Sequence, residues 1–243
     1  MCRLLIIALF IGQNIFHVDA QQPKNSMDTV WNLFKNNLKE KLPLYYSRIN
    51  APCSRSEIEK LESKLEIKLP QEVVELYMAN NGEDESWFVG GIMCGTRMLT
   101  LDGILKEWAS LKAIEEEYNF NAKWRGEIYP ANSIKPAAFN EKWIPIFSDD
   151  NGNFIGIDMA PGPNGKQGQV INFGTDEYDH FVIAGSLTGF IAFINLQFEN
   201  GNADKAIFLN EDGHHAMFGL TVESHLTDDL RTIVKTRAGN GHK

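Results

Sequence analysis

The residues best suited to chemistry form a short acidic run between two apolar segments. Asp149-Asp150-Asn151-Gly152-Asn153 places oxygen ligands at the first, third and fifth positions of a calcium-binding loop. An EF-hand also requires glycine at the sixth position and glutamate at the twelfth, and here these are Phe154 and Ala160. Asn-Gly is equally typical of a tight hairpin turn. Of the two interpretations, a calcium loop and a plain turn, we favour the turn.

A second group of chemically capable residues comes later in the chain. Asp176, Asp179 and His180 are close enough in sequence for a local acid–base or metal cluster, although a solvated turn before a strand is the simpler interpretation. The segment Gly185–Gly189 is not a G-x-S-x-G motif, and its Ser186 is better placed as a helix cap. We therefore expect a protein that is not an enzyme and has no metal or cofactor. A hydrolase or calcium-dependent module with dispersed residues is the alternative.

Composition narrows the classes of partner. The chain has 243 residues, 43% of them hydrophobic, which is enough for one sizeable core. Its formal net charge of −9 argues against a nucleic-acid binder, because such proteins need cations to displace phosphate counterions. The same charge is compatible with a basic protein partner. We expect a protein partner, for which a basic protein is one candidate, and no nucleic acid.

The N-terminus has the layout of a secretory signal peptide. Arg3 precedes the apolar run Leu4–Ile11, and Val18-Asp19-Ala20 supplies small residues before a cleavage site. We predict a signal peptide over 1–20, a linker over 21–27 and a secreted mature protein. A buried N-terminal helix is the alternative. No other segment approaches the length needed to cross a bilayer, so no membrane association is expected once the signal is removed.

Cysteine usage leaves one question open. After removal of the signal, Cys53 and Cys94 remain, and in a secreted protein these two residues can form a disulfide. The sequence does not give their separation, so pairing is not decided. No Cys-x-x-Cys is present, which makes a zinc site improbable.

Strand-forming segments surround the acidic run. Ile144–Phe147, Phe154–Met159 and Gln169–Phe173 are rich in Ile, Val and Phe, and turn residues separate them. They predict a three-stranded meander, and His180–Ala184 predicts a further strand. We also predict strands at Trp87–Met93, Met98–Leu101 and Ile207–Leu209.

Helical periodicity lies on both sides of this sheet. Helices are predicted from Asp28, from the Ser54–Glu57 capping box and from Pro70. A further helix follows Asp102, and a helix that is apolar almost all round follows Ser186. A polar helix is predicted over Val222–Lys235, and Phe120–Glu141 reads as a loop across the sheet edge. The order of elements predicts an α+β fold with a mostly antiparallel sheet, N-terminal helices and a packed C-terminal helix.

Several short stretches, in this order, resemble the SUKH superfamily and in particular its Smi/Knr branch. The resemblance runs roughly from Trp31 to Phe198. The stretches that carry it are Ile58–Glu62, Leu69-Pro70, Leu76-Tyr77, Asn81-Gly82, Leu105–Trp108, Trp143–Ile146, Asp150–Gly152, Ile157-Asp158, Gly168–Ile171 and Ala184–Ser186.

This resemblance implies a non-enzymatic α+β domain over 28–200 that acts by binding another protein, with 201–243 as a C-terminal extension. Bacterial members of the family neutralise toxins, and fungal members bind signalling proteins that control wall assembly. A toxin or a signalling protein is thus the expected partner. Tryptophans and acidic clusters such as Glu83–Glu85, Glu115–Glu117 and Asp149-Asp150 also suit an aromatic anchor with an acidic rim.

As a hypothesis, the partner contacts one sheet face and its loops. Asp158 and Gln169 have an alternative interpretation, as buried structural polar groups. The residues proposed to bind the partner are Trp143, Asp149, Asp150, Asp158 and Gln169.

Overall fold

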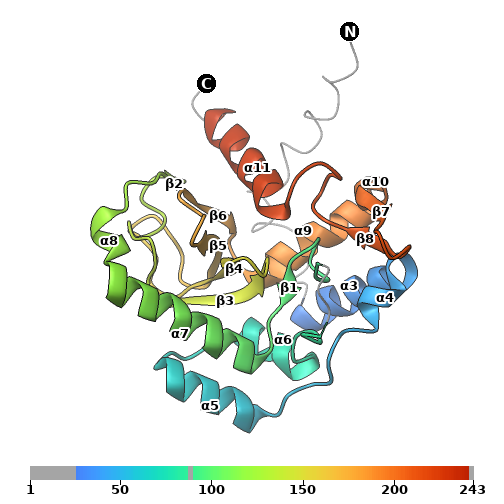
Figure 1. Ribbon diagram of the computed structural model, residues 1–243, viewed down its shortest axis with the longest axis horizontal. Coiled ribbons are helices and arrows are strands. Elements are labelled where there is room, and N and C mark those ends of the chain that lie inside the picture. The colour runs from blue at the N-terminus through green and yellow to red at the C-terminus, as the bar shows by residue number, and fades with distance from the viewer. Residues whose placement is uncertain (1–25, 87–89, 241–243) are drawn as a thin grey trace.

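A run of amphipathic helices precedes the sheet in the computed structural model, which describes residues 26–86 and 90–240 (Figure 1). Ser26 caps the first helix, and Ser54 and Glu57 form the predicted capping box of another. Each helix buries one apolar stripe. These helices are α3 (Met27–Lys41), α4 (Pro43–Tyr46), α5 (Arg55–Leu65), α6 (Gln71–Ala79) and α7 (Leu101–Tyr118).

The sheet has the strand order β1-β3-β4-β5-β6-β2. Every neighbouring pair is antiparallel except β2 and β6, which are parallel. The predicted meander and the strand after it are confirmed. The strands are β1 (Arg97–Met98), β2 (Ile128–Tyr129), β3 (Trp143–Ser148), β4 (Asn153–Asp158), β5 (Gln169–Gly174) and β6 (His180–Ala184).

Helix α9 (Leu187–Glu199) joins the sheet to the N-terminal helices. Ser186 caps it as predicted, and its apolar residues are buried on several sides. Phe190 of α9 meets Phe147 of β3 edge to face, with ring centroids 5.9 Å apart. The helix contacts β5 and β6 on one side and α3 and α6 on the other. It is therefore the centre of the core (Figure 1).

The chain after α9 returns to the sheet through α10 (Asn202–Ala206) and the hairpin of β7 (Ile207–Leu209) and β8 (His215–Met217). The last helix, α11 (Leu226–Asn240), packs against β6 and β2. It begins four residues later than predicted because Asp229 Oδ2 accepts hydrogen bonds from the Leu220 and Thr221 amides, which holds the preceding segment in a turn.

Two expectations need correction. The described part of the predicted strand Trp87–Met93, residues 90–93, forms turns and an isolated bridge, and the next strand is only Arg97–Met98. The region 120–141 is more ordered than predicted, since it contains α8 (Phe120–Lys123) and the edge strand β2. The overall class is α+β with a mainly antiparallel sheet, as predicted. No helix in the described ranges is long and apolar enough to cross a membrane.

Candidate protein-binding surface

The residues proposed from the sequence lie at opposite ends of the β3–β4–β5 meander. Trp143, Asp158 and Gln169 are cross-strand neighbours at one end, where Trp143 pairs with Asp158 and Asp158 with Gln169. Asp149 and Asp150 lie at the other end, in the turn that joins β3 to β4. The structure therefore does not bring the whole set together.

The first end is closed to solvent. Trp143 and Asp158 are fully buried, and Gln169 is nearly so. Asp158 Oδ2 accepts a hydrogen bond of 2.9 Å from Gln169 Nε2, and that amide also donates to the Ser133 carbonyl at 2.8 Å. Burial raises the pKa of Asp158, and the Ala160 amide and Gln169 oppose this shift. In this structure these groups hold strands and loops together.

The loop over this buried end packs closely against its neighbours. Lys166 N donates to Gln169 Oε1 at 3.0 Å, and Gly162 N donates to the Ser133 carbonyl at 3.1 Å. A Cβ atom at Gly165 would overlap the Ser133 carbonyl oxygen, so only glycine fits there. The loop 161–168 thus lies directly on the loop that contains Ser133.

The second end begins with a rigid acidic turn. Asp149 Oδ1 accepts hydrogen bonds from the Asn151 amide at 2.7 Å and the Asn153 amide at 3.0 Å. Asp150 and Gly152 have the positive φ angles, 62° and 93°, that this turn requires. The prediction of a hairpin turn is confirmed.

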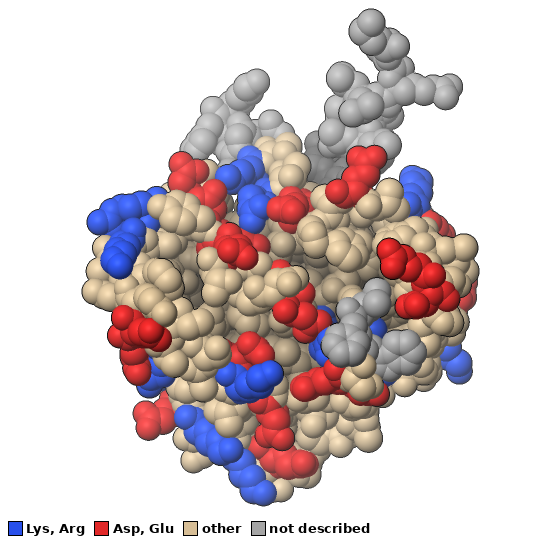
Figure 2. Space-filling model, in the orientation of Figure 1, with Lys and Arg blue, Asp and Glu red and all other residues tan. Residues whose placement is uncertain are grey.

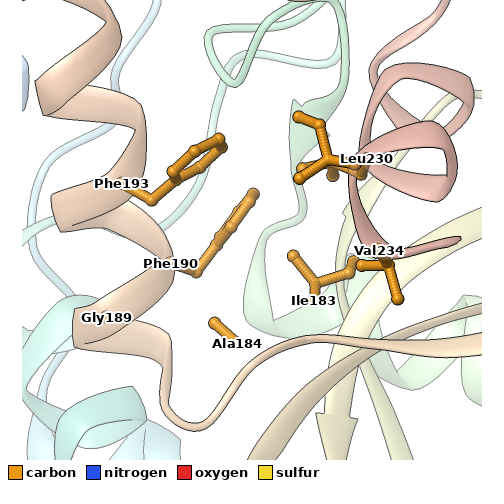
Figure 3. Close-up of a pocket in the computed structure, with 8 residues that line it drawn as sticks. Ile183, Ala184, Gly189, Phe190, Phe193, Leu230 and Val234 are labelled. Atoms are coloured by element: carbon orange, nitrogen blue, oxygen red, sulfur yellow. The ribbon is translucent and has the colours of Figure 1, made fainter. Parts of the chain in front are cut away.

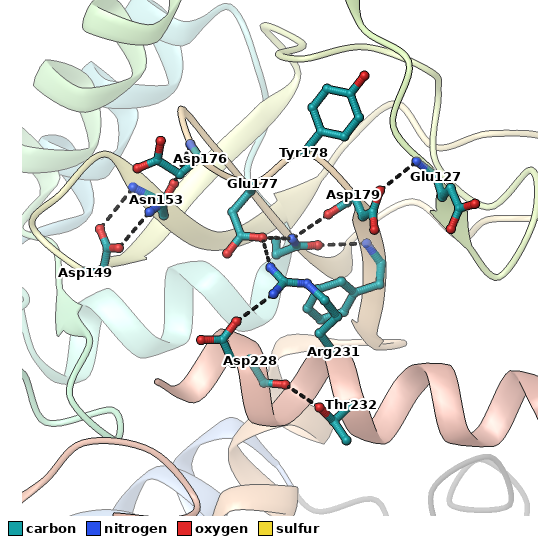
Figure 4. Close-up of polar contacts among 12 residues, drawn as sticks. Glu127, Asp149, Asn153, Asp176, Glu177, Tyr178, Asp179, Asp228, Arg231 and Thr232 are labelled. Carbon is teal, nitrogen blue, oxygen red and sulfur yellow. Dashed lines mark hydrogen bonds and ion pairs between the residues drawn. The ribbon is translucent and has the colours of Figure 1, made fainter. Parts of the chain in front are cut away.

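A second acidic loop lies beside this turn. The Thr175 amide donates to the Gly152 carbonyl at 3.0 Å, and the Asp176 amide donates to Asn153 Oδ1 at 3.0 Å. Figure 4 shows Asp149, Asn153 and Asp176 lying together. We refer to residues 149–153 and 175–179 as the acidic end.

The acidic end also presents an exposed aromatic side chain. Tyr178 is 58% exposed, and its ring points away from the polar contacts around it (Figure 4). Its backbone is fixed, because its carbonyl accepts a hydrogen bond of 2.9 Å from Trp124 Nε1. Tyr178 is not among the residues predicted from the sequence to bind a partner, although an aromatic residue within the acidic run Asp176-Glu177-Tyr178-Asp179 is a signal of such a surface.

Only part of the acidic charge at this end is neutralised. Asp150 pairs with Arg97 at 2.7 Å, Glu177 with Arg231 at 2.5 Å and Asp179 with Lys235 at 3.0 Å. Asp176 is exposed, and its carboxylate has no ion pair within the described part of the chain. On the face in Figure 2, acidic and basic side chains are interspersed and no continuous basic patch is visible.

His180 does not act with the neighbouring aspartates. It is buried, with Nε2 2.8 Å from the Ala137 carbonyl oxygen, and its ring stacks on Trp124 at a centroid distance of 5.3 Å. Burial lowers the pKa of His180 to about 4. Asp179 Oδ1 instead accepts a hydrogen bond from the Glu127 amide. Among the residues described, no group of three or more His, Cys, Asp or Glu side chains is arranged to hold a metal ion.

One acidic cluster expected at the surface is partly internal. Glu83 is fully buried and accepts hydrogen bonds from the Met98 amide at 2.7 Å and the Ile92 amide at 3.1 Å. Arg48 Nη2 lies 3.6 Å from Glu83 Oε2. Burial raises the pKa of Glu83 to about 7, while Arg48 opposes the shift. Glu83 therefore organises the 90–98 segment and takes no part in an acidic rim.

Comparison with known proteins decides the family. Residues 52–192 match the SMI1 / KNR4 family (SUKH-1). This chain belongs to that family. The match includes the whole meander, the acidic end and the start of α9.

Relatives in the SMI1/KNR4 family are fungal regulators. The Neurospora crassa glucan synthesis regulatory protein is 25% identical over 213 residues, covering 75% of this chain and 39% of the relative. The Schizosaccharomyces pombe cell wall biosynthesis/cell cycle regulator smi1 is 32% identical over 166 residues, covering 64% and 33%. The Saccharomyces cerevisiae cell wall assembly regulator SMI1 is 28% identical over 185 residues, covering 63% and 37%. The chain spans between 33% and 39% of the length of these three relatives.

These comparisons correct the predicted localisation. The expectation of a secreted protein was wrong, because the matched relatives are named as regulators of glucan synthesis and cell wall assembly and none is named as a secreted protein. The predicted signal peptide, residues 1–20, lies outside the described residues. Cys53 and Cys94 are both buried and free, so they do not form the disulfide that secretion would have allowed.

Proposed function

We propose that this chain is a non-enzymatic regulatory protein that binds a basic protein partner through the acidic end. Tyr178 is the observation that carries the proposal, because a large exposed aromatic ring stands on a fixed backbone beside unneutralised carboxylate. In the same proposal, residues 28–200 form the binding domain and 201–243 an extension of it.

The acidic end has the physical properties of a recognition surface. Aromatic side chains supply much of the binding energy at protein interfaces, and surrounding charges set specificity and association rate. The hydrogen bonds that the side chains of Asp149 and Asn153 accept hold the two turns in place before binding, so little conformational entropy is lost. Asp149 and Asp150 thus stay in the proposed surface, whereas Trp143, Asp158 and Gln169 are buried at the opposite end of the meander and do not belong to it.

A regulatory role fits the relatives better than toxin neutralisation does, since the matched fungal proteins are named as regulators of wall synthesis or assembly. The alternative of a hydrolase or calcium-dependent module gains no support from the described residues. His180 is buried away from the neighbouring carboxylates, and the Asp149 carboxylate is occupied by turn hydrogen bonds.

The test is affinity capture of partners by the full chain and by two matched double variants. Tyr178→Ala with Asp176→Lys changes the acidic end without removing a turn hydrogen bond, because the Asp176 side chain does not hold the turn. The control is Tyr118→Ala with Glu116→Lys, which alters an equally exposed tyrosine, 51% exposed, and acid at the end of α7.

We expect the acidic-end variant to lose at least about tenfold of the affinity for a captured basic partner, and the control to match the wild type. Binding to the wild type should also weaken as salt is raised. Equal capture by both double variants would overturn the assignment of the binding surface to the acidic end.

A further inference from the structure

We infer that α11 is a removable occupant of a helix-binding groove, and that the partner inserts a basic amphipathic helix in its place. This inference rests on the proposed function, and it specifies the chemistry of the partner. The groove lies between α9 and β6 and extends to the acidic end.

The apolar half of the contact is a single stripe on α11. Its residues Leu226, Leu230 and Val234 are each one turn apart and buried. Figure 3 shows Leu230 and Val234 facing Ile183 of β6 and Phe190 of α9. Spacing of this kind is typical of a helix held in a hydrophobic groove.

The polar half of the contact reaches the acidic end. Arg231 pairs with Glu177 at 2.5 Å (Figure 4), and Lys235, one turn later, pairs with Asp179 at 3.0 Å. Arg231 also lies over the Phe181 ring at 5.8 Å. The helix thus places two cations on the surface for which we proposed a basic partner.

The groove lies within the part of the chain that matches the family, whereas the helix that fills it lies outside that part. Ile183, Ala184 and Phe190 lie within the residues that match the SMI1/KNR4 family, as does the loop with Glu177 and Asp179. Helix α11 lies outside that match. A groove that belongs to the family domain is therefore covered here by a segment beyond it.

Helix α11 contacts the rest of the domain through one apolar stripe and two ion pairs. Packing against α9 leaves an apolar gap of about 20 Å³ beside Gly189. Lys235 is 40% exposed, and ion pairs with such exposure contribute little to stability. A segment held by few buried side chains opens at a lower free energy than the whole fold.

A separate protein is a better occupant than α11 of a second copy. The chain has a net charge of −9, so two copies repel each other, whereas a basic helix is attracted to the acidic end. The expected partner helix has apolar residues at i, i+4 and i+8 and cations at i+5 and i+9, matching Leu226, Leu230, Val234, Arg231 and Lys235.

The first experiment measures binding of a fluorescent peptide with the sequence of residues 224–240 to the full chain by anisotropy. The opened variant, Leu230→Asp with Arg231→Glu, changes α11 alone and keeps the groove. We expect the peptide to bind this variant at least about tenfold more tightly than the wild type, in which the tethered helix competes at high effective concentration. A control peptide with Arg231→Glu and Lys235→Glu should bind at least about tenfold more weakly.

Hydrogen exchange on the wild type is a second test, and it needs no substituted protein. Amides of α11 should exchange at least about a hundredfold faster than those of β4 and β5. Exchange of α11 at the rate of those strands, or no peptide binding to a folded opened variant, would overturn the inference. A dimer of the opened variant would assign the groove to a second copy and also overturn it. Neither assay needs a cellular partner, so their failure is separable from failure of the Tyr178 capture test.

Discussion

The two ends of the β3–β4–β5 meander carry similar side chains with opposite roles. At one end, the Asp158 carboxylate and the Gln169 amide bond to each other and to the Ser133 carbonyl, away from solvent. At the other, Asp149 and Asn153 form the same carboxylate–amide pairing at 2.8 Å in a partly exposed turn. Residue type alone therefore does not separate a structural polar group from one that is available to a partner.

The loops that cover each end make the difference. Residues 161–168 lie on the Ser133 loop and close the first end. The second end has only short turns, so Tyr178 and Asp176 remain in solvent. A buried polar network is costly to disturb, whereas exposed residues change binding with little effect on stability.

The largest expected effect is at the buried end. Asp158→Ala leaves the Ala160 amide and one Gln169 amide hydrogen without their acceptor and should lower the free energy of unfolding by about 2–4 kcal/mol. Urea unfolding measures this. Asp176→Ala is the matched control at the acidic end, with an expected change within about 0.5 kcal/mol. Equal losses for the two variants would remove the distinction between the ends.

Buried titrating groups should also give the stability a pH dependence. The folded-state pKa of Glu83 is raised from 4.5 to about 7, so its protonated form is favoured and stability falls as pH rises through that range. The folded-state pKa of His180 is lowered from 6.5 to about 4, so stability falls as pH drops through that range. Each slope approaches about 1.4 kcal/mol per pH unit at most.

Urea titrations at several pH values separate these two contributions. Glu83→Gln should remove the contribution that falls as pH rises from 4.5 to about 7 and keep the opposite contribution of His180. His180→Gln should remove the decline toward acid pH that His180 causes. If the pH dependence of the free energy of unfolding is unchanged in either variant, burial does not shift the pKa of the residue that was replaced.

A smaller effect is expected where the acidic end is paired. Asp150→Asn keeps a residue that tolerates the φ of 62° but removes the charge that meets Arg97. The free energy of unfolding should fall by about 0.5 kcal/mol, because the Asp150 side chain is 44% exposed and such ion pairs are screened. The loss should shrink in high salt. A loss as large as that of Asp158→Ala would mean that Asp150 stabilises the fold as much as the buried Asp158 does.

The smallest effect on stability, and the largest on binding, is expected at Tyr178. Tyr178→Ala should change the free energy of unfolding by no more than about 0.5 kcal/mol, because the ring is mostly in solvent. The same variant should reduce capture of the partner, as measured by titration against the purified partner. A stable variant with full affinity would leave the two ends without a functional difference.

Much of the fold could be predicted because local signals agreed with the tertiary structure. The Ser54–Glu57 capping box, the Asn-Gly turn and the alternating apolar segments each specify a local conformation. The strand predicted at Trp87–Met93 is not formed in its described part, residues 90–93, because there the backbone turns around buried Glu83. Such a buried carboxylate has no sequence signature.

The candidate surface was less predictable, because exposure depends on contacts between distant segments. Asp158 and Gln169 are closed off where loop 161–168 packs on the loop that contains Ser133, which is far away in the sequence. Tyr178 is exposed because Trp124 and Glu127 fix its loop from outside the sheet. Neither arrangement follows from the period of the apolar residues.

The short strands at the two edges of the sheet affect how readily chains associate with one another during folding. β1 and β2 are each two residues long, and they cover the longer strands β3 and β6. Each edge strand offers only two residues to a strand of another chain, which limits fibril-like association. Loss of the β2 pairing would expose His180–Ala184, a mostly buried strand with high β-propensity, as a template for aggregation.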